Sequence, residues 1–72
     1  MKNKEFEQTF CKKIQALRDA QGLSDSELSF QSGVPLATLQ QIAQNTLPDD
    51  FSVEYIFDLA RTLGCQAYEL CQ

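Results

Sequence analysis

Few residues in the sequence are suited to covalent or acid–base chemistry. The 72 residues include three cysteines and no histidine, so a cysteine nucleophile would lack the base that usually activates it. Cys11, Cys65 and Cys71 lack the spacing of a zinc site, and we expect them to be reduced thiols that pack inside the protein. No glycine-rich phosphate loop or spaced pair of carboxylates stands out. The sequence therefore predicts a binding protein, not an enzyme, with no metal and no cofactor.

The side chains best suited to binding lie in the stretch LSFQSGVPLATLQQIA, residues 28–43. A helix over residues 36–44 would turn Leu39 and Ile42 inward, because residues three apart share a helix face. The other side chains of this segment form the predicted binding surface: Leu36, Ala37, Thr38, Gln40, Gln41 and Gln44. They offer hydrogen bonds and apolar contacts, since the stretch contains no Lys or Arg. Alternatively, Leu36 packs in the core and the glutamines are merely solvated.

Two helices are predicted to precede this surface and to position it. The first spans residues 5–21 and ends at Gly22, because its apolar residues recur every three or four positions: Phe6, Phe10, Ile14 and Leu17. Ser24 and Glu27 form an S-x-x-E capping box, so a second helix begins near Asp25 and buries Leu28. Gly33 and Pro35 then form the turn into the third helix, which Asn45 ends.

The remainder of the chain predicts two more helical segments. A loop over residues 46–51 leads to Ser52, the expected cap of a fourth helix that ends at Gly64. Its predicted apolar stripe consists of Val53, Ile56, Phe57, Ala60 and Leu63. Residues 66–71 have room for one or two turns, with Tyr68 and either Leu70 or Cys71 packing back on the core. We therefore expect one all-α domain over residues 1–72, with residues 1–5 as a flexible N-terminus.

The spacing of small and apolar residues in the central segment is that of a helix-turn-helix. Leu28 faces inward, the small Ser29 lets two helices cross closely, and Gly33 permits the tight turn. The sequence resembles the λ-repressor-like, or XRE, helix-turn-helix family. The resemblance is carried by Ile14, Leu17 and Arg18, GLS at 22–24, EL at 27–28, SGV at 32–34, TL at 38–39, Ile42 and LARTLG at 59–64.

This resemblance implies a compact five-helix fold and a transcriptional regulator, typically a repressor, that binds duplex DNA as a dimer. The third helix would lie in the major groove with Leu36, Ala37 and Gln41 facing the bases. Of these, only Gln41, with Gln40 beside it, offers the paired hydrogen bonds that glutamine makes to adenine, whereas Leu36 and Ala37 suit a thymine methyl group.

The resemblance also assigns backbone-phosphate positions to Asp25, Thr38 and Gln44. Asp25 would repel a phosphate where the family often has glutamine. Ala43 stands where the family often has a glutamate that pairs with the arginine at the position of Arg18. We therefore expect that ion pair to be absent.

The charge distribution favours a second interpretation of the same fold. The formal net charge is −4, and positions 19–60 hold seven acidic residues and no Lys or Arg. A DNA reader ordinarily shows a basic surface. An acidic, degenerate helix-turn-helix would instead bind a basic protein as an antirepressor, an adaptor or an inhibitor of a DNA-binding regulator. No membrane-spanning run or targeting segment is visible, so we expect the cytoplasm.

Several side chains outside the predicted binding surface have structural roles as their expected interpretation. We expect Phe30 to pack under the first helix, with a dimer or partner contact as the alternative. Lys12 and Lys13 are expected to form a solvated face, with phosphate contact as the alternative. Phe51, directly before Ser52, is a candidate hydrophobic staple.

Overall fold

Five α-helices account for most of the computed structural model, which describes residues 4–71. In chain order they are α1 (Lys4–Ala20), α2 (Asp25–Ser32), α3 (Leu36–Ile42), α4 (Val53–Leu63) and α5 (Ala67–Leu70). There is no strand between residues 4 and 71. The predicted all-α, five-helix fold is confirmed. Helix α1 begins one residue before the expected position, so Lys4 and Glu5 are helical, and residues 1–3 lie outside the described part of the chain.

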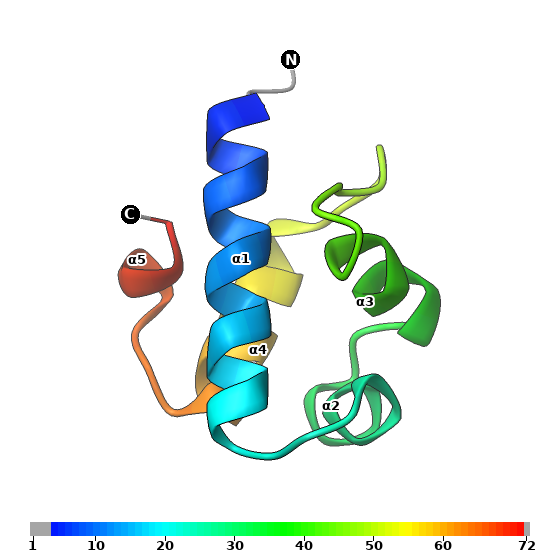
Figure 1. The fold of residues 1–72 in the computed structure, drawn as a ribbon, viewed down its shortest axis with the longest axis vertical. Helices are drawn as coiled ribbons and strands as arrows, with labels where there is room; N and C mark the ends of the chain where they lie inside the picture. Colours follow the sequence, from blue (N-terminus) through cyan, green and yellow to red (C-terminus); the bar gives the residue numbers. More distant parts are fainter. Residues whose placement is uncertain (1–3, 72) are drawn as a thin grey trace.

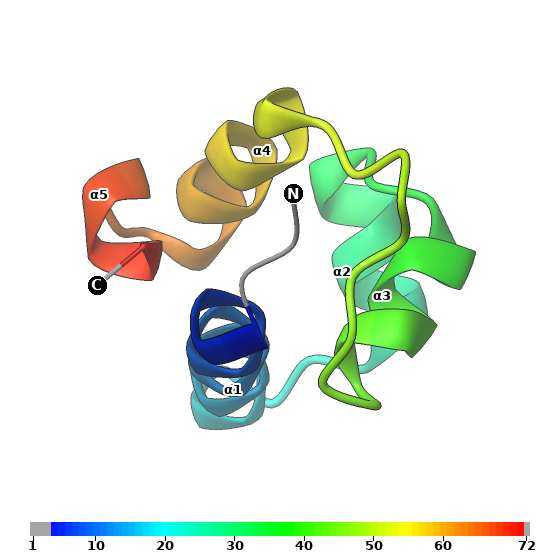
Figure 2. The ribbon, with the colours of Figure 1, turned by 90° about the horizontal axis from the view of Figure 1, so that it is seen from above.

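Helix α1 runs along the long axis of the molecule (Figure 1). Seen from above, α2 and α3 lie together on one side of α1, and α4 and α5 lie together on another (Figure 2). All five helices contribute to one buried core: Phe10, Cys11, Ile14, Leu28, Val34, Leu39, Ile42, Leu59, Ala60, Leu63 and Leu70. Because α3 is only seven residues long, it depends on this shared core for its position and its stability.

The helix ends follow from local sequence. The Ser24 hydroxyl accepts a hydrogen bond from the Glu27 amide, and the Glu27 carboxylate accepts one from the Ser24 amide, each at 3.1 Å. The predicted capping box at the start of α2 is therefore confirmed. Gly33 ends α2 with a φ of 83°, and Asn45 follows α3 with a φ of 63°. Helix α3 is two residues shorter than expected, because the Gln44 and Asn45 amides bond carbonyls only three residues back.

A chain of four aromatic rings joins α1 to the start of α4. Phe6 stacks on Phe10, Phe10 meets the edge of Phe51, and Phe51 meets the edge of Tyr55, with ring centroids 5.6–5.7 Å apart. Such offset and edge-to-face contacts add to the free energy of apolar burial. Phe51 therefore fixes the entry to α4 by packing against both α1 and α4.

The predicted apolar stripe of α4 was wrong at two residues. The side chains of Val53 and Phe57 are 66% and 59% exposed, whereas Leu59 is fully buried. Helix α4 has more apolar residues than one face can hold. The residues at positions 56, 59, 60 and 63 have helical spacing and form the face that packs on the core. Val53 and Phe57 lie one turn apart at the margin of that face.

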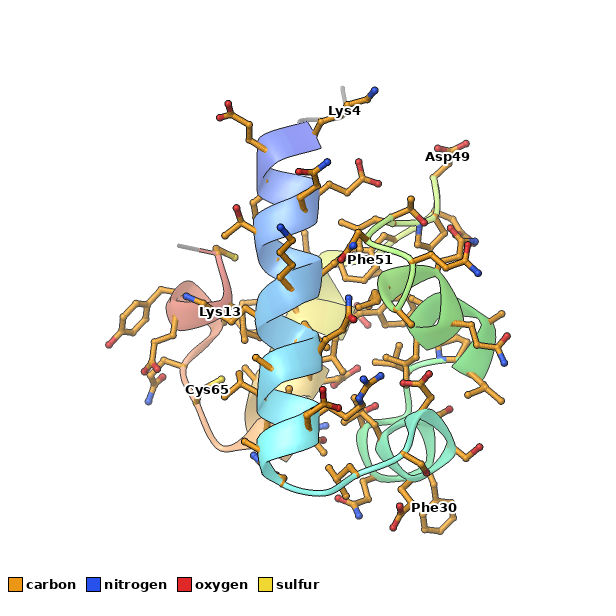
Figure 3. The ribbon with its side chains drawn as sticks, viewed as in Figure 1. Lys4, Lys13, Phe30, Asp49, Phe51 and Cys65 are labelled. Atoms are coloured by element: carbon orange, nitrogen blue, oxygen red, sulfur yellow. The ribbon has the colours of Figure 1, made fainter. Side chains whose placement is uncertain are left out.

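Two further packing expectations were wrong. Phe30 is 89% exposed instead of packing under α1. Its neighbours Leu28 and Ser32 are buried, and a residue two positions from each points about 200° away around the helix. Figure 3 shows Phe30 projecting from α2 away from the rest of the protein. In α5, Leu70 fills the core, while Tyr68 and Cys71 are exposed.

Candidate nucleic-acid interface

The turn between α2 and α3 is held by side-chain hydrogen bonds as well as by its glycine. The Gly33 amide donates to the Ser29 carbonyl at 2.9 Å, and the Ser29 hydroxyl donates to the Val34 carbonyl at 2.6 Å. The Val34 amide donates to the Ser32 hydroxyl at 3.1 Å, and the Val34 side chain is fully buried. These contacts fix the direction in which the chain enters α3.

Helix α3 turns one side to the core and the other to solvent. Leu39 and Ile42 are buried as predicted. Five of the six predicted site residues are exposed: Leu36, Ala37, Gln40, Gln41 and Gln44. Leu36 is 37% exposed, so it belongs to the outer surface although part of it is covered. The outer face of α3 therefore carries two apolar and two amide side chains, with Gln44 just beyond the helix.

Thr38 is not part of that outer surface. Its side chain is only 7% exposed, because Thr38 and Ile42 are four residues apart and share the side of α3 that meets the core. The expectation that Thr38 lies on or near the surface was wrong.

Three residues of α1 bind the segment that follows α3, and sequence reasoning missed all three. The Gln15 amide donates to the Ile42 carbonyl at 2.8 Å and to the Asn45 side-chain oxygen at 3.0 Å. The Cys11 thiol donates to the Thr46 carbonyl, with sulfur and oxygen 3.6 Å apart. The Glu7 carboxylate accepts from the Leu47 amide at 2.6 Å. We call Glu7, Cys11 and Gln15 the α1 clamp.

The α1 clamp has a weak signature in the sequence. Its members are four residues apart, so they form one row along α1. Polar residues in such a row ordinarily indicate a solvated face, and only the fold brings residues 42–47 against them. Burial and the neighbouring Glu7 carboxylate raise the pKa of the Cys11 thiol from 9.0 to about 11, so this cysteine stays protonated at neutral pH.

Asp25 is engaged in an ion pair inside the protein. The Arg18 guanidinium lies 2.5 Å from the Asp25 carboxylate and 3.0 Å from that of Asp19. Burial lowers the pKa of Arg18, but the hydrogen bonds to Asp25 and Asp19 raise it overall. As expected, Ala43 provides no partner for Arg18; Asp25 takes that role from the start of α2. Arg18 is thus shared by two carboxylates, and the group of Arg18, Asp19 and Asp25 keeps a formal charge of −1.

The outer face of α3 still has no positive charge of its own. No Lys or Arg occurs between positions 19 and 60. Across residues 4–71, no helix has the length and apolar character needed to cross a membrane. The same part of the chain contains no group of three or more His, Cys, Asp or Glu side chains placed to hold a metal ion.

Comparisons with known proteins agree with this geometry. A family model described as "Helix-turn-helix" matches residues 14–70. Among solved structures, the chain is similar to the restriction-modification controller protein C.AhdI from Aeromonas hydrophila. The two are 28% identical, the match covers 89% of this chain and 94% of that one, and the TM-score is 0.77. No curated protein sequence matches the chain.

The matched region runs from the middle of α1 to the end of α5 and includes the whole α2–turn–α3 unit. The family consists of regulators, not enzymes. From its turn geometry, its five-helix core and the extent of the match, the chain belongs to the XRE-like helix-turn-helix family of transcriptional regulators.

Proposed function

We propose that the protein acts in the cytoplasm as a transcriptional regulator that binds duplex DNA with α3 in the major groove. One observation carries this proposal: α3 is seated on the core by Leu39 and Ile42, while its opposite face is exposed. A helix held in this way can enter a groove without disturbing the core. The likeness to a restriction-modification controller protein supports a regulatory role.

The exposed residues of α3 define the expected readout. The Gln41 amide, with Gln40 beside it, is placed to donate to and accept from the edge of an adenine. Leu36 and Ala37 suit the methyl group of a thymine. Gln44, just beyond α3, offers a hydrogen bond to a backbone phosphate, a contact that would fix the position of the helix on the duplex without reading sequence. We therefore expect recognition of A·T base pairs.

We propose that two copies of the protein bind together. A pair of helix-turn-helix units reads two half-sites about one helical turn apart, which doubles the few base contacts that one α3 can make. Val53 and Phe57 are exposed on one side of α4, and an exposed apolar pair is suited to contact with a second copy. Sedimentation of the protein with and without Phe57→Glu tests this assignment.

The experiment that tests DNA binding is selection from a randomised duplex pool at low and then moderate salt, followed by sequencing. We expect an A·T-containing motif, with affinity that falls as salt rises because bound phosphates release counterions. Gln41→Ala should weaken binding to the selected motif, while Gln31→Ala, an exposed change in α2, should leave it unchanged. Retention of no duplex even at low salt would contradict the proposal.

The absence of positive charge on α3 favours a second candidate function. An exposed Leu36 and Ala37 with a rim of glutamines, in an acidic region, also suits the surface of a basic protein partner. In this case the protein would act as an antirepressor, an adaptor or an inhibitor of a DNA-binding regulator. Leu36→Asp should then abolish the complex while the domain stays folded, and complex formation should depend less on salt than DNA binding does.

A further inference from the structure

The positive charge that α3 lacks is present at the start of α1. Five basic residues lie within residues 4–71: Lys4, Lys12, Lys13, Arg18 and Arg61. Arg18 and Arg61 form ion pairs with aspartates. Lys13 donates to the Glu69 carbonyl on the α5 side of the molecule, at 3.0 Å. Lys4 and Lys12 remain exposed, and within residues 4–71 neither forms an ion pair.

Lys4 lies on the same side of α1 as the α1 clamp and therefore near the segment that follows α3. Lys4 lies three residues before Glu7 and extends the row formed by Glu7, Cys11 and Gln15. Because those three side chains hold residues 42–47, Lys4 faces the same segment from one turn further along the helix. Lys12 points away from this row by roughly a quarter of a turn, as the 3.6-residue repeat dictates. Figure 3 shows Lys4 at the end of α1 and Asp49 on the loop that follows α3.

Lys4 lines a polar recess with the segment that follows α3. The recess has a volume of about 410 Å³ and is lined by Lys4, Glu7, Gln8, Gln44, Asn45 and Thr46. Its wall therefore combines one ammonium group with side-chain amides, while the Thr46 hydroxyl donates to the Gln41 carbonyl at 3.2 Å. Glu7 also contributes a carboxylate, which accepts the Leu47 amide at 2.6 Å. Its negative charge remains and opposes an anion, so attraction to a phosphate depends on Lys4.

We propose that this recess binds a backbone phosphate of DNA, with Lys4 supplying the charge and Gln44 and Asn45 supplying neutral hydrogen-bond donors. A phosphodiester carries one negative charge and only acceptor oxygens, so it matches a site that offers an ammonium group beside amides. The inference rests on the proposed DNA binding and assigns the electrostatic attraction to DNA to Lys4. It also explains how α3, which has no Lys or Arg, could be held on DNA. The positive charge would come from Lys4 in α1, which the α1 clamp joins to the segment after α3.

The test measures affinity for the selected duplex by fluorescence anisotropy at several salt concentrations. It compares the unaltered protein with Lys4→Ala, Lys4→Arg and the matched control Lys12→Ala. Loss of one phosphate contact reduces the slope of log affinity against log salt by about 0.9, so two copies on one duplex together lose about 1.8, equivalent to roughly 60-fold weaker binding at 0.1 M salt relative to 1 M. We expect this loss for Lys4→Ala on specific and random duplexes alike, near-normal binding for Lys4→Arg, and no loss for Lys12→Ala.

The outcomes separate the inference from the function on which it rests. If the unaltered protein binds DNA and Lys4→Ala matches Lys12→Ala in affinity and slope, the phosphate site is refuted and the DNA-binding function stands. If the unaltered protein binds no duplex at low salt, the proposed function fails and this inference fails with it. Lys4 is exposed in the first turn of α1, where alanine is well tolerated, and thermal unfolding of each variant confirms that the fold is intact.

Discussion

Gln15 in the middle of α1 donates a hydrogen bond to the carbonyl of Ile42, the last residue of α3, with nitrogen and oxygen 2.8 Å apart. The same side-chain nitrogen lies 3.0 Å from the side-chain oxygen of Asn45. Gln15 thus binds both the end of α3 and the residue whose positive φ turns the chain away from it. The orientation of α3 therefore depends on α1 as well as on the turn from α2.

Gln15→Ala should destabilise the domain by about 1 kcal/mol, because it removes a partly buried hydrogen bond and leaves the Ile42 carbonyl with the Asn45 amide as its remaining donor. Urea unfolding followed by circular dichroism measures this change. Gln8→Ala, an exposed change on the same helix, is the matched control and should stay within about 0.5 kcal/mol of the unaltered protein. Equal stability of the two variants would show that Gln15 does not hold the end of α3.

Asp25→Gln should have opposite effects on stability and on DNA affinity. It removes the carboxylate nearest to Arg18, which should lower the free energy of unfolding by about 1 kcal/mol, as expected for a partly exposed ion pair. It also removes one negative charge and leaves Arg18 paired with Asp19 alone, so affinity for duplex DNA should rise several-fold at low salt. Asp58→Asn, which disrupts an exposed pair with Arg61 on α4, is the control. A fall in both quantities would contradict this reasoning.

The stability of the protein should fall in alkaline solution partly because of Cys11. Its pKa is about 11 in the folded protein against 9.0 ordinarily, so the unfolded thiol loses its proton first. The contribution is fully present below pH 9 and is lost as the pH rises toward 11, by up to about 1.4 kcal/mol per pH unit. Unfolding measured from pH 8 to 11 should show a shallower decline in Cys11→Ala, and parallel declines would refute this role.

Phe57→Glu should reduce self-association without unfolding the domain, because Phe57 is exposed and contributes little to the core. Sedimentation equilibrium should show a dimer for the unaltered protein and a monomer for the variant. Phe30→Glu, which changes an even more exposed aromatic residue on α2, tests whether the effect belongs to α4. Loss of the dimer in Phe30→Glu alone would move the interface to α2.

Local features of the structure were predictable from the sequence. The capping box at Ser24 and Glu27 and the left-handed conformations of Gly33 and Asn45 each depend on a few neighbouring residues, and all three are present as predicted. The inward direction of Leu39 and Ile42 followed from helical spacing and was also confirmed.

Features that depend on which elements meet were not predictable in this way. Helix α4 offers more apolar residues than its buried face accepts, so periodicity alone did not show that Phe57 lies outside the core. The bond between Gln15 and Ile42 spans 27 positions, and the pairing of Arg18 with Asp25 requires α1 and α2 to meet. The sequence alone does not identify such long-range partners, because they meet only when the helices pack together.

The division of α3 into a buried side and an exposed side also has a consequence for the evolution of this protein. Leu36, Ala37, Gln40 and Gln41 are exposed, so replacing them removes little of the packing that keeps the domain folded. Mutations can accumulate at these four positions and change what is recognised while the scaffold persists. The contacts from α1 to the end of α3 and the following segment go mainly to backbone atoms, so they hold α3 in place whatever side chains its outer face carries.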